Sequence, residues 1–253
     1  MTDDTHDVLT NAEHPDRRPH AVILSGSGRF ADPWHPFAET SASVAQILET
    51  DGFTTEIAGV DERMSDLSGA DLVVVNIGAP STPDLEQDTA VHRGLLEYVG
   101  TGGPLLVLHV SSTSLPSVPE WESIIGGLWV RGTTMHPDYG LAHIEVYPDR
   151  HPIVATTTDF DLYDERYSYL RVASEVVPLA AHRHDGIDHP ILWARTYESP
   201  AGTGGVEKPT HVSRVPARVV YDALGHDARS YDSAEHREII RRSARWLLGD
   251  LEG

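Results

Sequence analysis

The chain has 253 residues, which suits a single α/β domain, and its 40% of hydrophobic and 23% of charged residues are typical of a folded soluble protein. The net charge of −20 argues against nucleic acids and anionic membranes as partners, because the field repels phosphate, whereas a neutral sugar is compatible with it. The absence of cysteine excludes disulfides, thiolate metal ligands and a thiol nucleophile.

We do not expect the N-terminal segment to be an export signal. Residues 1–19 are polar, acidic and without hydrophobic periodicity, which predicts a disordered tail. They contain neither the basic nor the apolar part of a signal peptide, and no later stretch approaches the roughly 20 apolar residues of a membrane span. We therefore expect a cytoplasmic protein in which residues 20–253 form a single domain.

Strands and helices alternate in the first half of this domain. Apolar runs and helical spacing predict strands at 21–24, 53–58, 71–77 and 104–108, and helices at 37–50 and 85–100. This order implies a parallel sheet with helices on both faces. The predicted fold class is a flavodoxin-like three-layer α/β/α sandwich with a mostly parallel sheet.

The second half of the chain has shorter elements. They are a short helix at 119–125, strands at 142–147, 176–182, 190–195 and 218–221, and a last helix at 234–248. Residues 198–215 are rich in Gly, Thr and Pro and predict a long hairpin loop.

The loop after the first strand contains a weak nucleotide-binding pattern. Gly26, Gly28 and Ala31 fit the spacing G-x-G-x-x-A. Pro33 and Pro36 hinder an early helix start, so a flexible glycine turn is the better interpretation. No nucleotide cofactor is expected, and a nicotinamide-dependent enzyme is a distant third hypothesis.

The strand at 104–108 ends at His109, the most informative position in the chain. The carboxyl ends of parallel strands face the ligand crevice of an open α/β sheet, where an imidazole can serve as acid, base, nucleophile or metal ligand. Glu165 and His226 also follow apolar runs at expected strand ends. We therefore predict that His109, Glu165 and His226 converge in one pocket as catalytic residues.

The same three residues have other interpretations. Two histidines and a carboxylate form zinc sites in other enzymes, so a divalent metal such as zinc is an alternative role, although no short metal-binding spacing supports it. Structurally, Glu165 could instead pair with Arg166 or Arg171, and His226 could cap a helix. A second histidine group is interpreted as a surface cluster without function; it consists of His182, His184 and His189.

Four segments together resemble the ThuA-like (trehalose utilisation) family. In chain order they are Val22 to Gly26 with Trp34-His35; 102–109 with Trp121, Gly126-Gly127 and His136; 151–153 with Phe160 and 164–167; and 190–193, 218–221, 224–227 and Arg245-Trp246. The resemblance extends from about residue 20 to the C-terminus. It implies a fold like that of class I glutamine amidotransferases, in which a cysteine follows the central strand. His109 stands near that place, so thiol amidotransferase chemistry is excluded.

The resemblance also implies a role in sugar catabolism, on trehalose, another disaccharide or a 3-keto-glycoside. Acid–base hydrolysis or isomerisation is the leading hypothesis, because a proton next to a keto group can be removed without a redox cofactor. A non-catalytic sugar-binding or assembly protein on the same fold is the alternative, since fold alone does not define function.

The residues expected to contact the sugar are Trp34, His35, His136, Tyr167 and Asp227. Aromatic rings among them could stack on a sugar face. The long insert at 197–215 could reshape the pocket, and a homo-oligomer is compatible with the sequence.

Overall fold

The computed structural model describes residues 17–199 and 215–251. Its main feature is a nine-stranded sheet. In spatial order the strands are β2 (Thr54–Ala58), β1 (His20–Ser25), β3 (Leu72–Asn76), β4 (Leu105–Leu108), β11 (Ala217–Asp222), β10 (Ile187–Tyr197), β9 (Val177–His184), β6 (Gly140–Val146) and β7 (Phe160–Asp164). A small second sheet pairs β5 (Gly127–Leu128) with β8 (Arg171–Val172).

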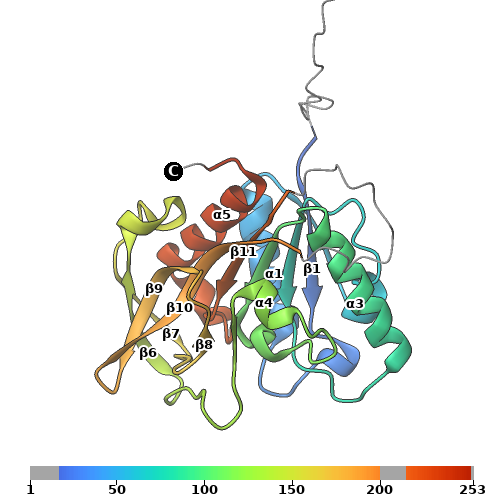
Figure 1. Cartoon of the computed structure of the whole chain (residues 1–253). Coiled ribbons are helices and arrows are strands. Elements are labelled where there is room, and N and C mark those ends of the chain that lie inside the picture. Colours follow the sequence, from blue (N-terminus) through green and yellow to red (C-terminus); the bar gives the residue numbers. More distant parts are fainter. Residues whose placement is uncertain (1–16, 200–214, 252–253) are drawn as a thin grey trace, which may run out of the picture.

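Helices cover both faces of the parallel half of the sheet, and so confirm the predicted sandwich (Figure 1). On one face lie α1 (Phe37–Thr50) and α5 (Ala234–Leu248), and on the other α3 (Leu85–Gly100) and α4 (Trp121–Ile125), while α2 (Val60–Arg63) is a single turn. Strands β2, β1, β3, β4 and β11 pair in parallel. Every residue of β3 and β4 is buried, as expected for strands that are covered on both faces.

The far half of the sheet is an antiparallel extension that the strand pattern did not predict. β10 runs antiparallel to β11 and β9, and β6 runs antiparallel to β9 and β7. β9 and β7 therefore point in the same direction as β4, and only β10 and β6 oppose it, so the sheet is still mostly parallel. β6 pairs with β9 only at Glu145 and Val146, and its earlier residues pair with β7 alone.

The chain is attached to the domain before the predicted start at residue 20. Arg17 pairs with Asp71 at 2.5 Å, and Arg18 donates to the carbonyl of Gly52 at 2.9 Å. Arg17 and Arg18 thus contact the domain just before its predicted start, and residues 1–16 lie outside the described part. Residues 200–214, most of the predicted insert, also lie outside it.

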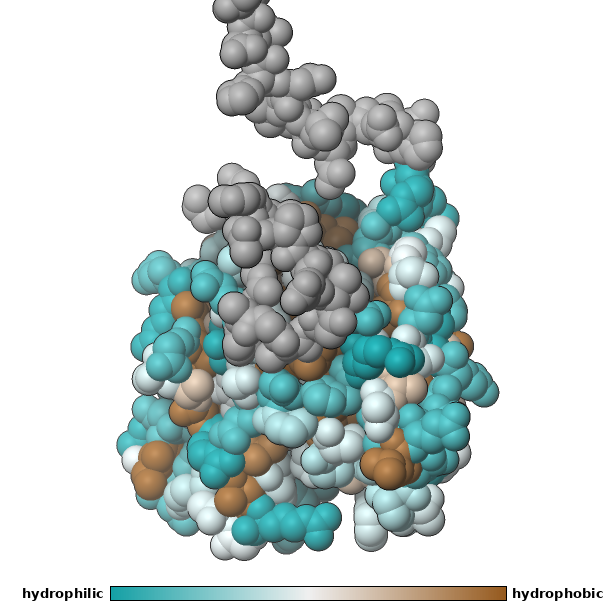
Figure 2. Space-filling view, turned by 45° about the vertical axis from the view of Figure 1, so that its right-hand side comes forward, coloured by the Kyte–Doolittle hydropathy of each residue, from teal (hydrophilic) through white to brown (hydrophobic). Residues whose placement is uncertain are grey.

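The surface is mostly hydrophilic, with hydrophobic residues in small scattered groups on the face that Figure 2 shows. Within residues 17–199 and 215–251, no helix combines the length and the apolar character that crossing a membrane requires.

A buried ion pair joins the end of β11 to α5. The Asp222 carboxylate lies 3.0 Å from Nε2 of His236, and both side chains are at most 1% exposed. Nδ1 of His236 lies 3.0 Å from both the carbonyl oxygen and the hydroxyl of Ser230, so a charged ring would have an acceptor at each nitrogen. Burial opposes this charge, but Asp222 outweighs it and raises the pKa of His236.

We expect the stability of the protein to depend on the charge of His236. His236→Leu would leave the Asp222 carboxylate buried without a counter-charge, which costs about 3–5 kcal/mol. Because folding raises the pKa of His236, its contribution is complete below the unfolded pKa of about 6.5 and is lost as the pH rises through the folded pKa. Urea unfolding of both proteins from pH 6 to 9 should give a free-energy difference that shrinks with pH.

The matched control is His143→Asn, which removes an exposed histidine from its pair with Asp161 and should change stability little. A difference between wild type and His236→Leu that does not vary with pH would contradict the charged pair.

Candidate functional site

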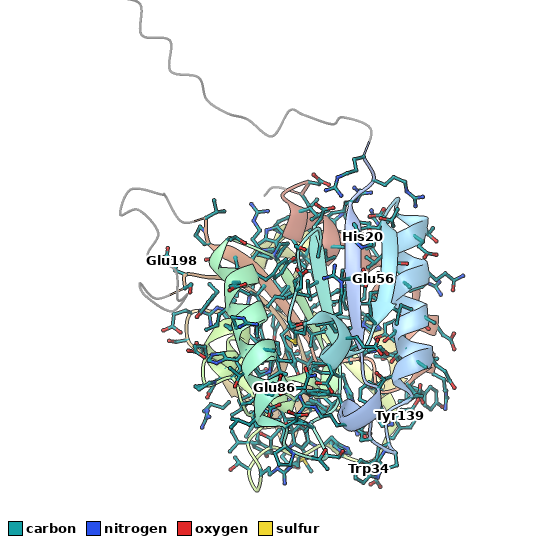
Figure 3. The ribbon with its side chains drawn as sticks, turned by 90° about the vertical axis from the view of Figure 1, so that its right-hand side faces the viewer. His20, Trp34, Glu56, Glu86, Tyr139 and Glu198 are labelled. Atoms are coloured by element: carbon teal, nitrogen blue, oxygen red, sulfur yellow. The ribbon has the colours of Figure 1, made fainter. Side chains whose placement is uncertain are left out.

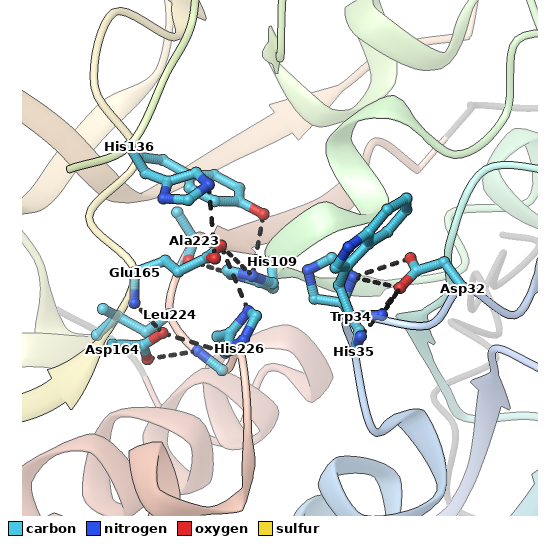
Figure 4. A network of polar contacts seen from close by, with 12 residues as sticks. Asp32, Trp34, His35, His109, His136, Asp164, Glu165, Ala223, Leu224 and His226 are labelled. Atoms are coloured by element: carbon cyan, nitrogen blue, oxygen red, sulfur yellow. Dashed lines mark hydrogen bonds and ion pairs between the residues drawn. The ribbon is translucent and has the colours of Figure 1, made fainter. Parts of the chain in front are cut away.

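Four titratable side chains meet at the edge of the sheet where the parallel strands end (Figure 4). His35 comes from the loop before α1, His109 follows β4, Glu165 follows β7 and His226 follows β11. One nitrogen or carboxylate oxygen of each lies within 4.8 Å of those of the other three. The structure thus brings the three predicted catalytic residues together and adds His35 to them.

His109 is held in one orientation from two sides. Its backbone has a φ of 46°, which is unusual for a non-glycine residue and occurs mostly where the surroundings enforce it. Its Nδ1 donates to the carbonyl of Ala223 at 2.7 Å, and its own carbonyl accepts from the hydroxyl of Tyr221 at 2.9 Å. Because Nδ1 donates to the carbonyl of Ala223, Nε2 is the ring nitrogen that faces the cluster.

His35 is oriented in the same way, by a carboxylate. Asp32 accepts from Nδ1 of His35 at 2.8 Å and from its backbone N–H at 2.9 Å. Nε2 is left buried and without a hydrogen-bond partner. Burial, together with the nearby His109, lowers the pKa of His35 to about 4, so the ring is neutral at pH 7 and its free lone pair points inward.

Glu165 is at the centre of the group. Its Oε2 lies 3.3 Å from Nδ1 of His226 and 3.4 Å from Nε2 of His109, and its Oε1 lies 3.5 Å from Nε2 of His136. The expected partner Arg171 pairs with Glu122 instead. Nδ1 of His226 is buried without an aligned hydrogen bond, although it is close to the carboxylate.

Burial and the neighbouring imidazoles act in opposite directions on the charge of Glu165. Burial opposes ionisation of Glu165, but His109 and His226 outweigh it and lower its pKa below the usual range. Burial likewise opposes charge on His226, and Glu165 outweighs it and raises the pKa of that imidazole. Glu165 is therefore a carboxylate at neutral pH and not a general acid.

Asp164 fixes the relative positions of Glu165 and His226. Its buried carboxylate accepts from the backbone N–H groups of Glu165 at 2.8 Å, Gly225 at 2.8 Å and His226 at 3.1 Å. Gly225 has a φ of 110°, which a side chain rarely tolerates, and a Cβ there would lie 2.6 Å from the hydroxyl of Tyr231. The turn that donates these hydrogen bonds to Asp164 therefore requires glycine at position 225.

The rim of the site carries the other predicted residues. His136 is 37% exposed, Trp34 is 72% exposed, and Trp34 lies with Tyr139 at the end of the molecule opposite to His20 (Figure 3). Sequence reasoning did not find Tyr139, whose ring lies 5.4 Å from that of His226.

Two of the predicted sugar contacts have structural roles. Tyr167 is buried, its ring stacks on His109 at 4.5 Å, and its hydroxyl lies 2.9 Å from Nε2 of His109. Tyr167 is therefore held against His109 and offers no exposed ring face to a sugar. Asp227 accepts from the backbone N–H of Arg229 at 2.8 Å and so caps the short helix η5 (Ala228–Asp232).

The second histidine group is not a surface cluster. His182 and His189 are buried and stack at 5.3 Å. Nε2 of His182 donates to the carbonyl of Tyr167 at 3.0 Å, and Nδ1 of His189 accepts from the N–H of Tyr169 at 3.1 Å. These two rings support the segment that carries Glu165.

Comparisons with known proteins agree with this fold. The family model ThuA, described as trehalose utilisation, matches residues 22–247. Similar solved structures include a ThuA-like protein of Parabacteroides merdae, with a TM-score of 0.70, 18% identity and coverage of 94% of this chain and 92% of that chain. A ThuA-like protein of Bacteroides uniformis has a TM-score of 0.67 and 15% identity. That match covers 94% of this chain and 95% of that chain.

A glutamine amidotransferase of Thermotoga maritima has a TM-score of 0.52 at 8% identity, and the match covers 92% of this chain and 99% of that chain. At these identities the structural likenesses show the fold alone. A search of curated proteins found no match.

Asp164→Asn should destabilise the protein by about 1–3 kcal/mol, because the amide NH₂ would face backbone N–H groups and leave at least one without an acceptor. Urea unfolding measures the loss. The control is Asp161→Asn on the same strand, whose carboxylate is exposed and pairs with His143. Equal stability of the two variants would show that Asp164 does not hold β7 to the turn after β11.

Proposed function

We propose that this chain, which belongs to the ThuA (trehalose utilisation) family, is an enzyme of carbohydrate catabolism that acts on a disaccharide such as trehalose or on its 3-keto derivative. The observation that carries the proposal is the convergence of His35, His109, Glu165 and His226 from four distant segments. Sites that only bind sugars need aromatic rings and neutral polar groups. Several titratable groups in one mostly buried cluster are typical of catalysis.

The chemistry that fits these groups is proton transfer next to a polarised oxygen. Removal of a proton beside a keto group develops negative charge on the keto oxygen. When water displaces the leaving sugar at a glycosidic carbon, the bond to the leaving oxygen breaks and negative charge develops on that oxygen. In this proposal His226, whose pKa is raised by Glu165, is the member of the cluster that donates toward that oxygen, and Glu165 holds its ring in place. Hydrolysis and isomerisation both remain compatible with it.

His136 is the best-placed group to move the proton. Its Nδ1 lies 3.0 Å from the carbonyl of Pro137 and donates to it, so Nε2 is the nitrogen that faces Glu165. Its side chain is 37% exposed, against 12% for His35, 1% for His109 and 16% for His226, so it has more contact with solvent than the three rings of the cluster. A proton on Nε2 could therefore pass between the substrate and water.

The sugar itself would lie against the rim. Trp34 offers an exposed aromatic face beside His35, and such faces stack on the apolar side of a sugar ring. The net charge of −20 favours a neutral substrate over an anionic one. A cytoplasmic location, without nucleic-acid or membrane partners, belongs to the same proposal.

A non-catalytic sugar-binding protein is the second candidate. The observation in its favour is the same exposed Trp34, because aromatic stacking alone suffices for binding. The two candidates differ in whether His109 and Glu165 matter for turnover.

We expect the purified protein to convert a 3-keto-disaccharide, for example 3-keto-trehalose, with products or solvent deuterium incorporation followed by NMR. His109→Ala and Glu165→Gln should each lower turnover at least about 100-fold, since each removes a group that stabilises the transition state. His143→Asn, which changes an exposed histidine outside the cluster, is the control for the loss of a histidine. Full activity of His109→Ala would contradict the enzyme proposal and favour the sugar-binding one.

A further inference from the structure

We propose that His35, His109, Glu165 and His226 form a mononuclear metal centre for a divalent transition ion such as zinc. The ligand atoms are Nε2 of His35, Nε2 of His109, a carboxylate oxygen of Glu165 and Nδ1 of His226. This inference deepens the proposed function by naming the ion of the same site. The metal proposal rests on the proposed function only for the role of the ion in catalysis. The geometry of the ligands does not depend on that function.

The histidines are prepared as metal ligands by their outer contacts. A metal-binding imidazole usually donates its second N–H to a carboxylate or a backbone carbonyl, which fixes the tautomer and aims the other lone pair at the ion. His35 does so through Asp32 at 2.8 Å, and His109 does so through the carbonyl of Ala223 at 2.7 Å.

Two buried nitrogens in the cluster have no hydrogen-bond partner. They are Nε2 of His35 and Nδ1 of His226. Buried polar atoms are almost always satisfied, so each unpaired one calls for an explanation. A single ion between the two rings and the carboxylate would satisfy both nitrogens.

The spacing of the ligand atoms also suits an ion. Nitrogen and oxygen ligands at 2.0–2.1 Å around a tetrahedral zinc lie about 3.3–3.4 Å from each other. The Oε2 of Glu165 lies 3.3 Å from Nδ1 of His226 and 3.4 Å from Nε2 of His109, at the long end for hydrogen bonds. These two separations match those of ligands around one tetrahedral ion, and all four ligand atoms lie within 4.8 Å of one another.

The donor set selects the class of ion. Three imidazoles and one carboxylate suit zinc and the neighbouring divalent transition metals, whereas magnesium and calcium prefer oxygen ligands. One carboxylate leaves the centre with net positive charge, which can polarise a keto or water oxygen that enters as a fifth ligand. The exposed side toward His136 and Trp34 leaves that oxygen a path to the centre.

Tyr167 provides a discriminating control. Its hydroxyl lies 2.9 Å from Nε2 of His109 and donates to the lone pair that the ion would use. The hydroxyl and the ion therefore compete, and Tyr167→Phe should bind the ion as tightly as wild type or more tightly. If Tyr167 were only a structural support for His109, its loss would weaken binding.

The test uses the full untagged chain, stripped with a chelator and titrated with Zn²⁺ by calorimetry and with Co²⁺ by visible absorption. We expect one ion per chain and cobalt absorption bands typical of nitrogen and oxygen ligands. His35→Asn and Glu165→Gln should each weaken binding more than about 100-fold, and Asp32→Asn about 10–100-fold. His143→Asn should leave binding unchanged, and circular dichroism would verify that each variant is folded.

Wild-type affinity in both Glu165→Gln and His35→Asn, or less than one ion per wild-type chain at saturation, would overturn the metal centre. The two proposals fail separately. An ion bound as predicted without turnover of any keto-disaccharide would contradict the proposed function alone. Turnover by the stripped protein without binding of either ion would contradict the metal centre alone.

Discussion

The carboxylate of Asp164 is the contact on which the arrangement of the site depends. It is buried, and it accepts hydrogen bonds from three backbone N–H groups, one beside Glu165 and two in the turn that carries His226. Strand β7 is at the far edge of the sheet from β2, with β10, β9 and β6 between it and β11. The hydrogen bonds from Gly225 and His226 to Asp164 join β7 to the turn after β11, and so hold Glu165 beside His109.

A second buried carboxylate, Asp222, also contacts nearby polar groups. The pair of Asp222 and His236 lies under the turn after β11, and Asp222 also accepts from the backbone N–H of Leu224 at 2.9 Å. Two buried carboxylates therefore hold the residues from Ala223 to His226, one from each side. That segment supplies the carbonyl that orients His109 as well as the imidazole of His226, so a small movement of it would disturb two members of the cluster together.

The sequence predicted the parallel half of the fold well, because its strands are continuous apolar runs and its helices are strongly periodic. The helices at 37–50, 85–100 and 234–248 have the predicted bounds. The convergence of His109, Glu165 and His226 could also be predicted, since strand ends collect at one edge of a sheet. The direction of β10 and β6 could not, because alternation of apolar residues does not report which neighbour a strand pairs with.

Other parts of the site depend on tertiary contacts that no sequence pattern records. The place of His35 within the cluster was missed, although Asp32 three residues earlier was a usable signal for an oriented imidazole. The lowered pKa of Glu165 required knowing that two imidazoles face it. The burial of His182 and His189 shows the same limit, because a strand with polar residues can still be covered when it supports a site.

The most direct test of the account is X-ray absorption spectroscopy at the zinc edge on the zinc-loaded protein, since it reports the number and kind of ligands around the ion. The account predicts a shell of four protein nitrogen and oxygen atoms at about 2.0–2.1 Å, with the outer-shell scattering of three imidazoles. A shell of oxygen atoms with one imidazole or none would contradict the claim that these four side chains act as a single centre.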